Sequence, residues 1–227
     1  MIPRPTDPLI VALDVSDLSR AEELASLLAP EVAMLKVGFE LFWAHGPEAV
    51  RRIGSHAPVF VDSKLHDIPS TVEAASANIT RLGAAMFNVH ALGGEAMMRS
   101  ALRGAERASQ EQGGALPLVI AVTVLSSHSG ESLASAASLA YEAKAAGLHG
   151  VVVAGDDVED VRAACGEEFV LVVPGVRPEG SNGDDQVRVL TPSAAVDKGA
   201  DYLVVGRPIT AAADPSGAAR SILRMIR

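Results

Sequence analysis

The sequence predicts an α/β fold of the (β/α)8 type, a TIM barrel. Eight short apolar runs, rich in valine, recur along the chain, and stretches with helical features separate them. Strands that are apolar along their whole length are typical of parallel sheets covered by helices. Eight strand–helix units in 227 residues suit the size of this barrel.

Each apolar run has the length of a strand and is too short to cross a bilayer. The runs occupy residues 9–14, 34–38, 59–64, 86–91, 118–125, 150–155, 170–175 and 201–208. An open doubly wound sheet is the alternative, but that fold often has a glycine-rich turn after its first strand. Here Asp14-Val15-Ser16 follows the first run, with no glycine. This favours the barrel.

Capping residues, prolines and glycines predict the helices between the runs. The predicted helices are 18–28 after Ser16 or Asp17, a stretch from Ser70 or Thr71 to Leu82 before Gly83, 96–112 before Gly113-Gly114, and 132–146 before Gly147. Two more begin at Thr191-Pro192 and Asp214-Pro215, where proline suits the first helical position. No linker or low-complexity segment interrupts the pattern, so residues 1–227 are predicted to form one domain.

Composition narrows the function classes. Hydrophobic residues make up 48% of the chain, which predicts a large core. A net charge of −9 argues against nucleic acid or an anionic membrane as a partner. A single cysteine, Cys165, allows no internal disulfide, and the first residues, MIPRPTDP, lack the apolar run of a signal peptide. Both features predict a cytoplasmic protein.

The segment VFVDSKLHDIP, residues 59–69, is an apolar strand that ends in charge. Strand side chains alternate between faces, so Asp62 and Lys64 are expected to point the same way. Other polar residues also stand at predicted strand ends, which meet at one face of a barrel: Asp14, Lys36, Asn88, His90, Thr123, Arg177 and Arg207. Burying charge is costly unless it is paired. Any one of these residues could form a structural ion pair, but their convergence predicts an active site.

Three chemistries suit such a site. Aspartates with His66 or His90 could bind a metal ion, although Lys36 and Lys64 would repel a cation. A lysine could form a Schiff base, which requires a neutral amine. A lysine could instead stay charged and act as an electrostatic partner and proton donor, a state that neighbouring carboxylates favour. The third chemistry fits best.

The last two predicted strands indicate a phosphate site. PGVRPEG (174–180) and VGRPIT (205–210) each place arginine beside glycine, in the loops where barrels commonly bind phosphate. Arginine grips phosphate through paired hydrogen bonds, although Arg177 and Arg207 could also be surface ion-pair residues. The polar loops 177–186 and 126–132 are expected to act as lids over the ligand.

Together these residues resemble the orotidine 5′-monophosphate decarboxylases over nearly the whole chain. The most specific motif is D-x-K-x-x-D, formed by Asp62, Lys64 and Asp67 and followed by Ile68-Pro69. Keto-gulonate phosphate decarboxylases and hexulose phosphate synthases share this motif but use magnesium. They usually carry an acid where this chain has Lys36, so that lysine favours the first family.

The resemblance implies a role for each residue. Lys64 is the proton donor, Asp62 lies beside the substrate carboxylate, and Lys36 and Asp67 complete the charged network. The implied substrate-binding residues are Asp14, Lys36, Ile68, Thr71, Thr123, Ser126, Ser127, Pro174, Arg177, Gln186, Gly206 and Arg207. Among them Asp14 and Lys36 bind the ribose, and Thr123 with Ser126 or Ser127 contacts the pyrimidine. Gln186 contacts the ligand from a lid. Arg207 and Gly206 bind the phosphate, and Arg177 supports the phosphate end of the site.

The resemblance also implies a substrate, an assembly and a chemistry. The substrate is orotidine 5′-monophosphate, a small nucleotide, and the enzyme is a homodimer in which Asp67 reaches the partner's site. The chain has no motif for pyridoxal phosphate or thiamine, so no cofactor and no metal are expected. The alternatives are a magnesium-dependent sugar-phosphate enzyme of the related barrels and a non-catalytic barrel that binds a phosphate ligand.

Overall fold

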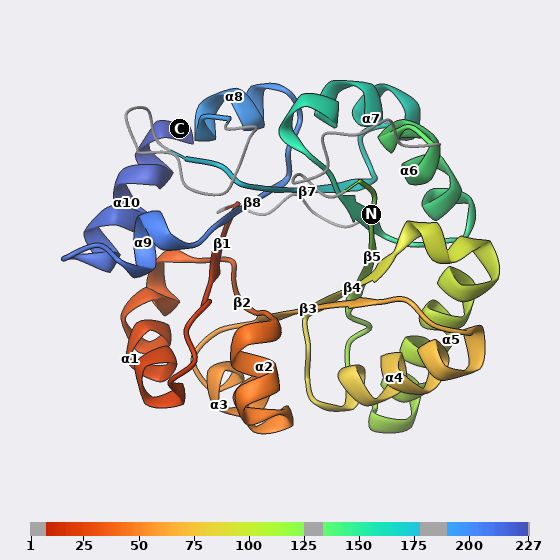
Figure 1. Cartoon of the computed structure of the whole chain (residues 1–227), viewed down its shortest axis with the longest axis horizontal. Helices are drawn as coiled ribbons and strands as arrows, with labels where there is room; N and C mark the ends of the chain where they lie inside the picture. Colours follow the sequence, from red (N-terminus) through yellow and green to blue (C-terminus); the bar gives the residue numbers. More distant parts are fainter. Residues whose placement is uncertain (1–7, 125–133, 178–189, 227) are drawn as a thin grey trace.

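Eight parallel strands close into a barrel, as predicted (Figure 1). The computed structural model describes residues 8–124, 134–177 and 190–226. The strands are β1 (Leu9–Ala12), β2 (Met34–Val37), β3 (Val59–Leu65), β4 (Met86–His90), β5 (Leu118–Val122), β6 (Gly150–Val152), β7 (Val170–Pro174) and β8 (Tyr202–Val205). Each strand pairs with the next in the chain, and β8 closes the ring by pairing with β1.

Helices surround the ring of strands (Figure 1). They are α1 (Leu18–Leu28), α2 (Phe39–His45), α3 (Pro47–Gly54), α4 (Pro69–Arg81), α5 (Gly94–Gln112), α6 (Ala136–Ala145), α7 (Val158–Cys165), α8 (Pro192–Asp197), α9 (Arg207–Thr210) and α10 (Pro215–Ile226). None of the helices in the described part of the chain combines the length and the apolar character needed to span a membrane. The prediction that 1–227 form one domain stays a prediction.

The predicted caps are correct at three helices. Asp17 rather than Ser16 caps α1 and accepts the backbone N–H of Arg20 at 2.7 Å. Thr191 caps α8, and the Asp214 carboxylate accepts a backbone N–H in the first turn of α10. Elsewhere the predicted starts are wrong by a few residues: α5 begins two residues before 96, and α6 begins after a Ser135 cap rather than at 132.

The start predicted for the helix after β3 is also wrong. This helix, α4, begins at Pro69 instead of after Ser70 or Thr71, and Ile68 is its N-cap without a side-chain hydrogen bond. Proline suits this first position because its fixed φ is helical and its missing N–H would have no partner there. The rigid Pro69 therefore sets the boundary.

Alternation along the strands determines which side chains face the barrel interior. On β3, Phe60 packs in the inner cluster, whereas Val59 and Val61 pack in the outer cluster beneath the helices. The inner cluster also holds Ile10 and Met34. Two residues beyond Met34 and Phe60, the inward positions of β2 and β3 become the charged Lys36 and Asp62. On β1 the inward Ala12 is still apolar, and the charged Asp14 follows just beyond the end of the strand.

Candidate active site

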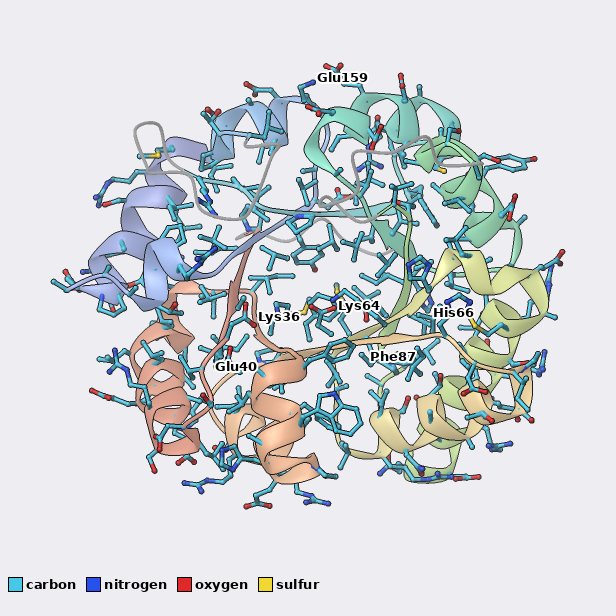
Figure 2. All side chains as sticks on the ribbon, viewed as in Figure 1. Lys36, Glu40, Lys64, His66, Phe87 and Glu159 are labelled. Carbon is cyan, nitrogen blue, oxygen red and sulfur yellow. The ribbon has the colours of Figure 1, made fainter. Side chains whose placement is uncertain are left out.

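Charged side chains of alternating sign lie at the carboxyl ends of β1, β2 and β3, facing the barrel interior. Lys36 Nζ lies 3.0 Å from Asp14 Oδ1 and 3.3 Å from Asp62 Oδ2. Lys64 Nζ lies 2.6 Å from Asp62 Oδ1. Figure 2 shows Lys36 and Lys64 within the ring of strands. The prediction that Asp62 and Lys64 meet is confirmed, and the network links three neighbouring strands.

The charges of this network stabilise one another. Burial alone raises the pKa of Asp62, but the charges of Lys36 and Lys64 outweigh it and lower that pKa below its ordinary value, helped by hydrogen bonds from Lys64 and Asn88. Burial alone lowers the pKa of Lys36, but Asp62 and Asp14 reverse this effect and raise it. Asp62 therefore stays an anion and Lys36 a cation at neutral pH.

Lys64 has an unusual backbone. Its φ is +42°, a left-handed value, and it is the one non-glycine residue with a positive φ among those that the structure describes. The pairing of β3 with β4 also changes register between Val61 and Leu65. Such bulges often redirect a side chain beside an active site. The irregularity lies at the lysine that the sequence analysis singled out.

Asn88 on β4 joins the network directly. Its amide Nδ2 donates to Asp62 Oδ1 at 2.7 Å, and its Oδ1 accepts the backbone N–H of Lys64 at 2.6 Å. The sequence predicts Asn88 at a strand end but indicates no role for it in the site. A polar amide within the otherwise apolar run at 86–91 was the available signal, because such a buried group needs partners.

Two cavities meet at the charged network. The larger, of about 420 Å³, is lined by Asp14, Lys36, Arg177 and Arg207 among others. The smaller, of about 180 Å³, has mostly apolar walls and is also lined by Lys64. Residues that line both are Lys36, Asp62, Pro174 and Val204. A ligand that occupied both cavities would contact the arginines in the larger one, apolar walls in the smaller one, and Lys36 and Asp62 in both.

Several predicted residues fall into the larger cavity. Pro174, Gly206 and Arg207 line it, as does Arg177, which is buried. Glu40 on α2, which the sequence analysis did not select, also lines the cavity and accepts a hydrogen bond from Ser16 Oγ (labelled in Figure 2). The sequence gives no indication that Glu40 belongs to the site, because an acidic residue is common in the first turn of a helix.

Other predicted residues lie outside these cavities or outside the described ranges. Asp67 and Ile68 are exposed in the loop after β3, and Thr71 is exposed on α4. Asp67 accepts the backbone N–H of Ile68 at 2.6 Å. Thr123 is buried, and its hydroxyl donates to the carbonyl of Val152 at 3.0 Å. The predicted contacts and lids at Ser126, Ser127 and Gln186 lie outside the described residues.

Two histidines stack beside the network. The rings of His66 and His90 lie 5.3 Å apart between their centres. Burial, together with the nearby His66 and Lys64, lowers the pKa of His90. The part of the chain that the structure describes contains no group of three His, Cys, Asp or Glu side chains arranged to hold a metal ion.

The fold and the site define a (β/α)8-barrel protein with a lysine–carboxylate network at the carboxyl ends of its strands. The model of the Orotidine 5'-phosphate decarboxylase / HUMPS family matches residues 7–222. The chain belongs to this family.

Relatives and solved structures agree with this assignment. An orotidine 5′-phosphate decarboxylase from Moorella thermoacetica is 47% identical, with 95% of this chain and 90% of the relative covered. One from Anaeromyxobacter dehalogenans is also 47% identical, with 96% and 98% covered. The crystal structure of the enzyme from Lactobacillus acidophilus matches with a TM-score of 0.83 and 34% identity, covering 97% of this chain and 99% of that one. The resemblance found in the sequence is confirmed, and these relatives support assigning the chain to the carboxy-lyases.

Proposed function

We propose that this protein converts orotidine 5′-monophosphate to uridine 5′-monophosphate and CO₂, the last step of de novo UMP synthesis, without a cofactor. The observation that supports this most strongly is the position of the Lys36–Asp62–Lys64 network at the junction of the two cavities. Relatives named for the same reaction span nearly the whole chain.

The network suits the chemistry of this reaction. Breaking the bond between C6 of the pyrimidine and its carboxylate leaves an electron pair in the ring plane, where the ring π system does not delocalise it. A fixed ammonium beside C6 stabilises the developing charge and then donates a proton to it. Lys64 takes this role, and the lysine recovers its proton from solvent. Asp62 lies beside the departing carboxylate, and its repulsion of that group favours release of CO₂.

The remote phosphate contributes to the same step. Arg207, with the backbone of Gly206, holds the phosphate at the far end of the larger cavity, and Arg177 supports it. Binding energy from a group that does not react can order the site around the reacting bond. Asp14 and Lys36 form an ion pair that lines the same cavity, and they bind the ribose.

The direct test is turnover of orotidine 5′-monophosphate, followed by loss of its absorbance, with and without EDTA. We expect turnover that EDTA does not change, because an ammonium rather than a metal ion stabilises the charge. Turnover abolished by EDTA would instead assign the chain to magnesium-dependent chemistry. Tight binding without turnover would make it a non-catalytic phosphate-ligand barrel.

The phosphate site predicts a selective effect of Arg207→Ala. We expect kcat/KM to fall roughly 100-fold, the size of a charged hydrogen-bonded contact of about 1.5–3 kcal/mol. For orotidine, which lacks the phosphate, the same change should have little effect. Arg99→Ala is a matched control, because that guanidinium pairs with Glu95 on the helix α5. Equal losses for both substrates would make Arg207 structural.

We further propose that the active protein is a homodimer whose barrel mouths face each other. Exposed apolar side chains gather where β2, β3 and β4 end: Phe39, Trp43, Ile68 and Leu92. The Phe39 ring lies 5.4 Å from Lys64 Nζ, so this apolar rim adjoins the charged network. Asp67 lies within the same rim, from which it reaches the partner's site.

A further inference from the structure

Asn88 binds three consecutive residues of the neighbouring strand. Its side chain is buried, and both ends of its amide are used, one by the Asp62 carboxylate and one by the Lys64 backbone N–H. Its backbone carbonyl accepts the hydroxyl of Ser63 at 2.8 Å. One residue on β4 therefore fixes the whole segment that carries the charges.

These bonds stand where the ordinary strand ladder is interrupted. Val61 on β3 is aligned with Phe87 on β4, but the next aligned pair is Leu65 with Val89. Four steps along β3 thus correspond to two along β4, and the segment between lacks the regular pairing. The amide of Asn88 supplies a fixed acceptor for the Lys64 N–H at the point where φ turns positive. A conformation that an L-residue rarely adopts needs such support from its surroundings.

The same amide orients the carboxylate that holds the ammonium. Asp62 Oδ1 accepts both Asn88 Nδ2 and Lys64 Nζ, while Lys36 faces the other oxygen. Rotation of this carboxylate would break the amide contact and move the ammonium. Asn88 thus controls the position of Lys64 in two ways, through its backbone and through its ion-pair partner.

We propose that Asn88 is a positioning residue for the decarboxylation, holding the Lys64 ammonium at the junction of the two cavities through the Lys64 backbone and the Asp62 carboxylate. This inference rests on the proposed function. Asn88 lines neither cavity among the described residues, so it acts through Lys64 and Asp62 rather than on the substrate. The Asp62 carboxylate needs a donor and the Lys64 N–H needs an acceptor. A side-chain amide supplies both at once, whereas a carboxylate only accepts and an aliphatic side chain does neither.

The test compares Asn88→Leu and Asn88→Asp with wild type and with Asn78→Leu, which makes the same substitution on α4 away from the site. A misplacement of about 1 Å can lower a rate 100-fold, so we expect Asn88→Leu to lower kcat by roughly that factor. The affinity for UMP should change by less than about threefold, because contacts to phosphate and ribose come from other strands. Asn78→Leu should match wild type in both measurements.

The pH profile separates positioning from a merely structural role. Asp62 faces Lys36 from β2 and Lys64 from β3, with Asp14 beyond Lys36, and those charges remain in the Asn88→Leu variant. Losing the amide donor removes one of the contacts that lower the pKa of Asp62. The acid limb of kcat/KM should therefore move to higher pH. In Asn88→Asp, activity should instead rise as the pH falls, because only the protonated new carboxyl can donate to Asp62.

Each outcome decides the question. An unchanged kcat in a folded Asn88→Leu protein would overturn the inference. A kcat that falls only in parallel with UMP affinity and thermal stability would also overturn it. In both cases turnover by the wild-type protein would leave the proposed function intact. Wild-type protein without turnover would overturn both. If Asn88→Leu does not fold, the nearly isosteric Asn88→Asp provides the test: a low kcat that rises on acidification supports positioning, and wild-type kcat refutes it.

Discussion

Replacing Lys64 by alanine is expected to lower kcat by about 10⁴-fold or more, because in the proposed mechanism one change removes both the charge beside C6 and the proton donor. The product UMP should still bind, since the arginines of the larger cavity and the Asp14–Lys36 pair remain. Steady-state turnover and titration with UMP measure the two quantities. A large loss of turnover with retained binding would assign Lys64 to the chemical step.

Two controls accompany this variant. Lys198→Ala removes a lysine whose Nζ lies 3.5 Å from the carboxylate of Glu159. Glu159 lies on the outside of the barrel (Figure 2), so this variant should leave turnover unchanged. Borohydride reduction of wild type in the presence of substrate should leave no adduct on Lys64, because the proposed mechanism uses this amine, paired with Asp62 at 2.6 Å, as an acid and not as a nucleophile. A trapped adduct would replace the electrostatic mechanism with a Schiff base.

Mixing two inactive variants is expected to restore activity. Lys64→Ala and Asp67→Ala are unfolded together and reassembled, and about half of the dimers then contain one chain of each kind if pairing is random. If Asp67 acts across the interface, each mixed dimer has one site with both lesions and one with none. Roughly a quarter of wild-type activity should therefore return, by the additivity of independent sites.

The matched control combines Lys64→Ala with Asp62→Ala. These two side chains contact each other within one chain at 2.6 Å, so every site of that mixed dimer keeps a lesion and no activity should return. Mass spectrometry shows whether mixed dimers have formed. Mixed dimers of the first pair without activity would refute the shared site but leave the decarboxylase proposal intact.

The strands and the charged rows were predictable because both depend on local pattern. Continuous apolar runs indicate buried parallel strands, and period-two alternation brings Asp62 and Lys64 to one face. The helices α2 and α3 were not predicted, because each follows a glycine N-cap, Gly38 or Gly46, which has no side chain to mark the start of the helix.

The role of Asn88 could not be predicted for a different reason. Its contacts depend on a register change between two strands that are far apart in the sequence, and alternation assumes a regular strand. For the same reason, strand alternation gives no indication that Lys64 has a positive φ. Sequence patterns therefore predict the charged side chains of the proposed active site but not the irregular backbone that orients them.

Closure of the ring through β1 and β8 has a consequence for how the active state is reached during folding. Leu9 is aligned with Leu203, so the first and last strands meet only when nearly the whole chain has been made. The larger cavity takes Asp14 from the beginning of the chain and Arg207 from its end. Contacts this distant in sequence pay a large loop-closure entropy and form late. The proposed nucleotide site is thus complete only in the fully closed ring, and a nascent chain that still lacks β8 has no Arg207 to complete the larger cavity.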